Sequence, residues 1–194
     1  MSIRHGLLAL LSRGPRYGYQ LRSEFEASTG ATWPLNVGQV YTTLSRLERD
    51  GMVAHAGADE EGRFVYRITP EGEAHVRHWF ATPVARAERP RDELAIKIAM
   101  AVTTPGVDAR QVVQAQRPAT LRALQDLTRL KAEPLAEPAD QGEHAWRLVL
   151  ESMIFQAEAE VRWLDHSESY VARAVTPAPG APAADAPARG DARR

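Results

Sequence analysis

The chain has 194 residues, of which 44% are hydrophobic and 25% are charged, and its formal net charge is −1. This length allows one or two domains with a buried core, and the composition is ordinary for a soluble globular protein. The absence of cysteine excludes disulfides and thiolate sites, and no stretch approaches the roughly 20 apolar residues of a membrane span. We therefore expect a cytoplasmic protein without a membrane partner.

Two short helices are predicted in the first thirty residues. The first is capped by Ser2, covers residues 3–11 and has an apolar face rich in leucine. The second runs from about residue 19 to residue 28 and stops at Gly30, because glycine readily takes the left-handed conformation of a helix end. Residues 13–18, with the sequence RGPRYG, are expected to form a turn between them.

A third helix is predicted from Asn36, which can cap it, to Gly51. Its apolar side chains recur every three or four residues and so share one face: Val37, Val40, Leu44 and Leu47. The opposite face carries amide, hydroxyl and guanidinium groups in place of the Glu–Lys pairs usual on a solvated helix: Gln39, Thr42, Thr43, Ser45, Arg46 and Arg49. Acidic residues come only at its far end.

After Gly51 the apolar period changes from about 3.6 to about 2 residues, which predicts two strands, over 52–56 and 63–69, joined by a polar hairpin. Pro70 then suits the first position of another helix. Three helices, a two-stranded ribbon and a further helix are the order of a winged helix-turn-helix. We expect residues 1–82 to form this domain.

The remainder of the chain is predicted to be α-helical. Residues 83–92 contain two prolines and are interpreted as a linker, and residues 93–175 as a helical dimerisation and effector domain. The sequence ELAIKIAMAV (93–102) is apolar nearly all round and should be buried. Residues 176–194 are rich in alanine and proline, so we expect a disordered tail.

Two further features of the helical part bear on its assembly. Pro118 should kink or split a helix predicted over 108–132, because proline lacks the N–H of the helical hydrogen bond. A long helix from about residue 144 to residue 174 carries an apolar stripe with few partners in the same chain. Such stripes are usually buried in another subunit, which predicts a homodimer.

The third helix is the candidate for nucleic-acid binding. An α-helix fits the DNA major groove, where Gln can pair with adenine and Arg with guanine while hydroxyl groups contact bases or backbone. Tyr41 suits a phosphate contact but could equally be a core tyrosine, and Arg63 could act as a wing residue or balance nearby acids. The candidate DNA-binding residues are Asn36, Gly38, Gln39, Tyr41, Thr42, Thr43, Arg46 and Arg63.

Three segments together resemble the N-terminal domain of the PadR family of transcriptional regulators: LLALLSRGPRYGYQLRSEF, GQVYTTLSRLERDGMV and YRITPEG. The resemblance covers residues 3 to about 80, and Thr42 stands where that family usually has proline. The helical part is similar in layout to the dimerisation region of the virulence-activator, AphA-like branch. The resemblance implies a dimeric, ligand-responsive DNA-binding protein, most often a repressor, that recognises two half-sites of a palindromic operator in double-stranded DNA.

Other functions find less support in the sequence. His75 and His78 are spaced to chelate a metal but lack a firm third ligand, and no catalytic grouping or phosphate loop is recognisable, so we expect no metal, no cofactor and no enzymatic activity. Trp146 and Trp163 could line a cavity for a small apolar or aromatic effector, or simply pack. The alternative function is a winged-helix module for protein–protein assembly without DNA contact, which the near-neutral charge favours.

Overall fold

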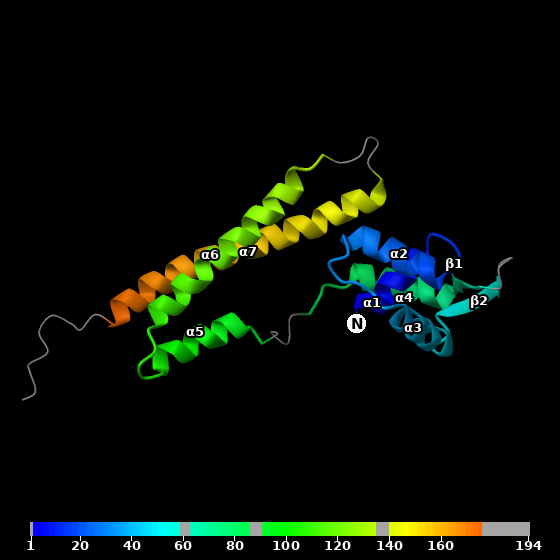
Figure 1. Ribbon diagram of the computed structural model, residues 1–194. Helices are drawn as coiled ribbons and strands as arrows, with labels where there is room; N and C mark the ends of the chain where they lie inside the picture. The colour runs from blue at the N-terminus through cyan, green and yellow to red at the C-terminus, as the bar shows by residue number, and fades with distance from the viewer. Residues whose placement is uncertain (1, 59–62, 86–90, 135–139, 176–194) are drawn as a thin grey trace, which may run out of the picture. The chain divides into compact units, whose positions relative to one another are not determined.

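The computed structural model describes residues 2–58, 63–85, 91–134 and 140–175 (Figure 1). Helices dominate, and within these ranges none is both long enough and apolar enough to cross a membrane. The elements, in chain order, are α1 (Ser2–Leu11), β1 (Arg16–Tyr17), α2 (Gly18–Thr29), α3 (Val37–Arg49), β2 (Val53–Ala58), β3 (Phe64–Ile68), α4 (Pro70–Ala81), α5 (Glu93–Thr103), α6 (Ala109–Ala132) and α7 (Gln141–Val175). The predicted disordered tail, residues 176–194, lies outside the described residues.

The contacts divide the chain into two compact units. One comprises residues 1–90 together with 124–156, and the other comprises residues 91–123 together with 157–194. The sequence-based division into domains followed chain order, whereas the first unit takes in the end of α6 and the beginning of α7.

The first unit contains a winged helix-turn-helix with a three-stranded antiparallel sheet of order β1–β3–β2. The predicted two-stranded ribbon is present as β2 and β3, and β1, which the sequence did not predict, adds a third strand. Residues 16 and 17, expected in a turn, pair with β3 in the register Arg16 to Tyr66 and Tyr17 to Val65. Two residues are too few to show an alternating pattern, and their partner lies far along the chain, so sequence periodicity could not detect this strand.

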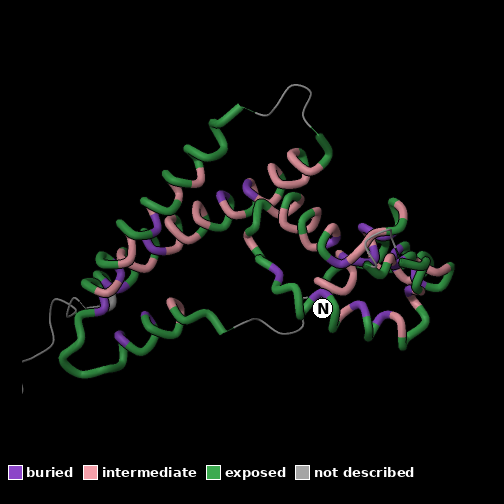
Figure 2. Tube along the Cα trace, turned by 45° about the vertical axis from the view of Figure 1, so that its right-hand side comes forward, coloured by how far each residue is buried: buried purple, intermediate pink, exposed green. Residues whose placement is uncertain are grey.

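A leucine-rich core holds these elements together (Figure 2). Three side chains of α3, those of Val40, Leu44 and Leu47, have no exposed surface. They pack with residues from α1, α2, the connection between α2 and α3, the sheet and α4: Leu7, Leu8, Leu10, Leu11, Leu21, Leu35, Val53, Tyr66 and Val76. The predicted apolar face is confirmed except at Val37, which is 39% exposed because it is the first residue of the helix and lies at the margin of this core.

Polar contacts fix both ends of α3. At its start the Asn36 side chain accepts a hydrogen bond from the backbone N–H of Gly38, at 2.7 Å. At its end Arg4 of α1 donates to the carboxylate of Asp50, also at 2.7 Å, and this hydrogen bond lowers the pKa of Asp50 from its ordinary value of 3.8. Thr69, which caps α4, donates from its hydroxyl to the carbonyl of Gly51. The helix is thus tied to α1 and to the end of the sheet.

The second unit is built from α5, the first part of α6 and the last part of α7. Its buried side chains form two small clusters: Ile98, Val113 and Leu164, and Ala101, Ala109 and Val171. The prediction that residues 93–102 are buried all round is only half met, because Ile96, Met100 and Val102 are each at least 50% exposed. A single chain supplies apolar partners to one side of α5 only.

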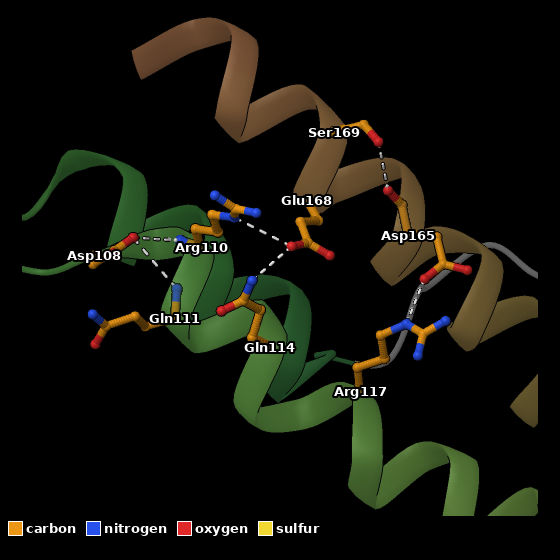
Figure 3. Close-up of polar contacts among 8 residues, drawn as sticks. All are labelled: Asp108, Arg110, Gln111, Gln114, Arg117, Asp165, Glu168 and Ser169. Carbon is orange, nitrogen blue, oxygen red and sulfur yellow. Dashed lines mark hydrogen bonds and ion pairs between the residues drawn. The ribbon is translucent and has the colours of Figure 1, made fainter. Parts of the chain in front are cut away.

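A series of polar contacts joins α6 to α7 (Figure 3). Arg117 pairs with Asp165 at 2.6 Å, and Gln114 and Arg110 both bond Glu168, at 2.7 and 3.2 Å. On the other side of Pro118 the buried Thr120 donates to Glu160 at 2.6 Å (Thr120 is not drawn in the figure). The helix is continuous through Pro118, so the predicted split does not occur. Contacts with α7 before and after the proline keep both parts of α6 helical.

Truncation of the buried face of α3 should destabilise the fold far more than truncation at its margin. We expect Leu44→Ala to lower the free energy of unfolding by about 2–5 kcal/mol, because it removes a fully buried side chain and leaves a cavity. Val37→Ala, on the same helix, should cost under about 1 kcal/mol. Urea denaturation followed by circular dichroism, at one protein concentration, measures both, and equal losses would contradict the packing described here.

The contact between Arg4 and Asp50 should make stability depend on pH. Because the folded-state pKa of Asp50 is lowered, its contribution is present above about pH 4 and is lost as the pH falls through the folded-state pKa. We therefore expect Asp50→Asn to lower the melting temperature slightly at pH 7, and the difference from the wild type to shrink as the pH falls below about 4. The exposed Asp126→Asn is the control. A difference that persists at low pH would rule out this ionic contribution.

Candidate nucleic-acid interface

The exposed side of α3 is polar because its other side is taken by the core. With Val40, Leu44 and Leu47 buried, the helical period places the amide, hydroxyl and guanidinium groups outward. Thr43 is half-buried at the margin of this polar face. The remaining five side chains are exposed: Gln39, Thr42, Ser45, Arg46 and Arg49. The buried face therefore decides which side chains another molecule can reach.

Two of these side chains have no internal contacts. Gln39 and Arg46 make no side-chain hydrogen bond or ion pair with any other residue in the described part of the chain, whereas the neighbouring Arg49 is 3.3 Å from Asp50. Both groups are solvated and lie on the side of the helix opposite the core. A guanidinium group and an amide are the groups that read guanine and adenine in the major groove.

The threonines on this face are held by the helix itself. Thr42 donates from its hydroxyl to the carbonyl of Gly38 at 2.8 Å, and Thr43 donates to the carbonyl of Gln39 at 2.7 Å. Each oxygen keeps its acceptor capacity, so it can accept from a base amino group without losing the internal bond. Asn36 is engaged in a different way, because its side chain caps the helix and fixes where the first turn lies.

The acidic residues at the end of α3 each have a polar partner. Glu48 lies 3.1 Å from Nε2 of His55, and Asp50 is bonded by Arg4 and Arg49. The ring of His55 packs against Phe64 and Tyr66, and burial, with the nearby Glu48, raises the pKa of Tyr66. An anionic backbone that approaches α3 would therefore meet Arg46, which is unpaired among the described residues, whereas both acids at the end of the helix have a polar partner.

Tyr41 is neither a core residue nor a free surface residue. It is 40% exposed, and its ring lies on Gly18, the first residue of α2. A Cβ atom at Gly18 would lie 2.8 Å from Cζ of Tyr41, so only glycine allows this packing. The phenol hydroxyl is thereby placed beside the amino end of α2, where free backbone N–H groups favour a phosphate. The sequence reasoning missed Gly18, although the YGY motif contains it.

The wing is joined to the same region through the strand that the sequence did not reveal. The guanidinium carbon of Arg63 lies 4.4 Å from the centre of the Tyr17 ring, a cation–π contact between β1 and the start of β3. The alternative partners of Arg63, Glu60 and Glu61, lie outside the described residues. Arg67 is exposed further along β3 and makes no ion pair within the described ranges.

The histidines considered as metal ligands do not face one another. His75 of α4 instead lies beside His5 of α1, with their Nε2 atoms 3.1 Å apart, and the ring of His5 is parallel to that of Trp79. His78 is 3.4 Å from the hydroxyl of Thr82. Among the described residues no three His, Asp or Glu side chains are grouped as metal ligands.

The two tryptophans considered for effector binding lie in different units. Trp146, near the start of α7, lines a cavity in the first unit and also lies on Gly30 at the end of α2. Trp163 packs beside the core of the second unit and lines an open groove of about 340 Å³ between α5 and α7. The two side chains therefore do not share one cavity.

Both parts of the chain match known protein families. Residues 7–78 match the transcriptional regulator PadR-like family, and residues 90–171 match the virulence activator alpha C-terminal family. Over 172 residues the chain is 23% identical to the negative transcriptional regulator PadR of Bacillus subtilis (strain 168), an alignment that covers 84% of this chain and 93% of that protein.

Solved structures share the fold over nearly their whole length. The virulence activator AphA of Vibrio cholerae is 24% identical, with a TM-score of 0.64, and the match covers 89% of this chain and 99% of AphA. Bacillus subtilis PadR in complex with operator DNA is 20% identical, with a TM-score of 0.65 and coverage of 88% and 99%. The same protein in complex with p-coumaric acid is 20% identical, with a TM-score of 0.67 and coverage of 89% and 99%.

Proposed function

Because this chain belongs to the PadR-like family of transcriptional regulators and carries the virulence-activator type of C-terminal part, we propose that it is a sequence-specific, ligand-responsive repressor that binds DNA as a homodimer. The observation that carries the proposal is the exposed face of α3, where Arg46 and Gln39 are unpaired among the described residues and the adjacent acids each have a polar partner. A relative of the same fold has been solved in complex with operator DNA, which supports DNA binding by this chain.

On this proposal the residues of the interface divide into readers and anchors. Arg46 reads guanine, Gln39 reads adenine, and Thr42 and Thr43 accept from base amino groups. Phosphates are held by the backbone of Gly38 and, at the start of α2, by the hydroxyl of Tyr41, while Asn36 sets the position of the first turn. Arg63, stacked on the Tyr17 ring, reaches the backbone or minor groove beside the wing.

The homodimer is supported by apolar side chains that a single chain leaves in water. On α5, Ile96 and Met100 are 50% and 55% exposed, and on α7, Leu148 and Phe155 are 70% and 64% exposed. Apolar helix faces of this kind are stable when they are buried against another subunit. A two-fold dimer would present two copies of α3 to half-sites of a palindrome spaced about 34 Å apart, one turn of DNA.

The proposed direction of regulation and the proposed response to a ligand are inferred from related proteins. The aligned Bacillus subtilis protein is a negative regulator, and its structure is known both with operator DNA and with p-coumaric acid. We infer repression here, relieved or modulated by a small molecule that alters how the two heads meet DNA.

Arg46→Ala should weaken binding to the operator by about 1–3 kcal/mol, roughly 5- to 150-fold, because it removes a base contact. The operator is first selected from a random pool of duplexes, and fluorescence anisotropy then measures the dissociation constants. Arg129→Ala, which removes an exposed arginine on α6, is the matched control and should bind as the wild type does. Unchanged affinity of the Arg46 variant would remove this residue from the interface.

The dependence of affinity on salt separates DNA binding from a role in protein assembly. Neutralising each phosphate should lower the logarithm of the association constant by about 0.9 for every tenfold rise in salt concentration. A protein interface with an apolar centre would not show this slope. If the purified dimer selects no duplex at moderate ionic strength, in the absence of any effector, the proposed function is wrong.

Met100→Glu should convert the dimer to monomer, because it places a charge in the proposed apolar interface on α5. Lys97→Glu, on the same helix and also exposed, adds the same side chain at a polar position and should leave the dimer intact. Sedimentation velocity distinguishes the species. A wild-type protein that is monomeric at micromolar concentration, or two variants that dissociate equally, would contradict this interface.

A further inference from the structure

A cavity of about 160 Å³ lies in the first unit, between the end of α6 and the beginning of α7. Its apolar wall includes Leu130, Trp146 and Leu150, and its charged wall consists of Glu133, Glu143 and Arg147. A cavity of about 150 Å³ holds one benzene ring, so this one is matched to a ligand with a single ring. Its charges decide which kind of ligand it would accept.

Two cationic side chains near the cavity, those of Arg147 and Lys131, bind other groups of the protein. The guanidinium of Arg147 donates to the backbone carbonyls of Lys131 and Glu133, at the carboxyl end of α6, with the second bond at 3.0 Å. The ammonium of Lys131 lies 2.6 Å from the carboxylate of Glu151, whose pKa this contact lowers. Arg147 keeps its positive charge but directs these N–H groups to carbonyls, and with Glu133 and Glu143 the cavity wall has a formal charge of −1.

Glu143, one of the two acids in the wall, takes part in the hydrogen bonds that cap the start of α7. Glu143 accepts a hydrogen bond from the backbone N–H of Asp140, and the Asp140 side chain accepts one from the N–H of Glu143, at 3.0 and 2.8 Å. This reciprocal capping lies at the amino end of α7, where the helix dipole favours negative charge.

Glu133 is the acid in the wall whose carboxylate has no hydrogen-bond or ion-pair partner in the described ranges. It directly follows the last residue of α6, where the helix dipole disfavours negative charge. Its carboxylate makes no hydrogen bond or ion pair with any residue of those ranges, and the residues that follow it, PLAEPA, contain no lysine or arginine. A carboxylate at the unfavourable end of a helix, beside an indole ring, is the arrangement that binds a cation.

We propose that this cavity binds a small organic cation about the size of one ring, a methylated pyridinium or quaternary ammonium compound. Its charge pairs with Glu133, and its flat or methylated face lies against Trp146. The role of this ligand as the effector of the regulator depends on the proposed function. The binding of the ligand in the cavity does not depend on it. The chemistry differs from that of p-coumaric acid, the ligand of the solved relative.

The same tryptophan connects the cavity to the helix-turn-helix. A Cβ atom at Gly30 would clash with the indole ring of Trp146, so the ring rests directly on this glycine. Gly30 ends α2 with φ of 56°, and Ala31 follows with φ of 53°, so the chain turns sharply here toward α3. A ligand that displaces Trp146 therefore moves the turn that positions the recognition helix.

Isothermal titration calorimetry of the full chain, without DNA and at constant ionic strength, tests the site. The probes are N-methylpyridinium, its uncharged isostere toluene, and benzoate as a ring-sized anion. We expect N-methylpyridinium to bind at least tenfold more tightly than the other two. Glu133→Gln should weaken that binding at least tenfold, whereas Glu71→Gln, an exposed acid on α4, should leave it unchanged. No binding of the cation, equal binding by the Glu133→Gln variant, or tighter binding of benzoate would overturn the proposal.

Coupling to DNA is measured separately, so that the two proposals fail independently. Saturating N-methylpyridinium should change the dissociation constant for the selected operator by at least threefold in the wild type and not in the Glu133→Gln variant. If the ligand binds but leaves the affinity for DNA unchanged, the link through Trp146 and Gly30 is wrong while the site stands. If the ligand binds and no duplex is selected, the regulator function fails and the cation site remains.

Discussion

The orientation of α3 depends on the complete burial of Val40, Leu44 and Leu47. Because these side chains fill the leucine core, the helix cannot rotate about its axis without exposing apolar surface or burying a guanidinium group. Every other feature of the interface follows from this constraint. The polar face points outward, the Asn36 cap sets the start of the helix, and Asp50 meets Arg4 at its end.

The formal charge of −1 conceals a local arrangement that suits an anionic partner. Within α3 and its cap the acids Glu48 and Asp50 are paired, while Arg46 has no partner among the described residues. Electrostatic attraction at contact distance depends on charges within about one Debye length, roughly 8–10 Å, rather than on the sum over the chain. Neutral composition is therefore compatible with DNA binding when the acids near the contacting face are satisfied internally.

The helical part uses different surfaces of α7 for different contacts. Residues of its first part, including Trp146, pack within the first unit against the turn of the helix-turn-helix. Its last part packs on α5 and α6 and is tied to α6 by the polar contacts of Glu168, Asp165 and Glu160. The proposed cation site lies at the first part of α7, in the same unit as the DNA-binding head.

The sequence by itself determined the α1 to α4 order, the hairpin, the polar face of α3 and the resemblance to the PadR family, because helical and strand periods are written in neighbouring residues. Only the tertiary structure decided the pairing of β1 with β3, the packing of Tyr41 on Gly18, the continuity of α6 through Pro118 and the contact of Trp146 with Gly30. Each of these joins residues far apart in the chain or depends on a neighbouring helix. A local pattern states which side chains must be buried, but it does not state which distant backbone will receive them.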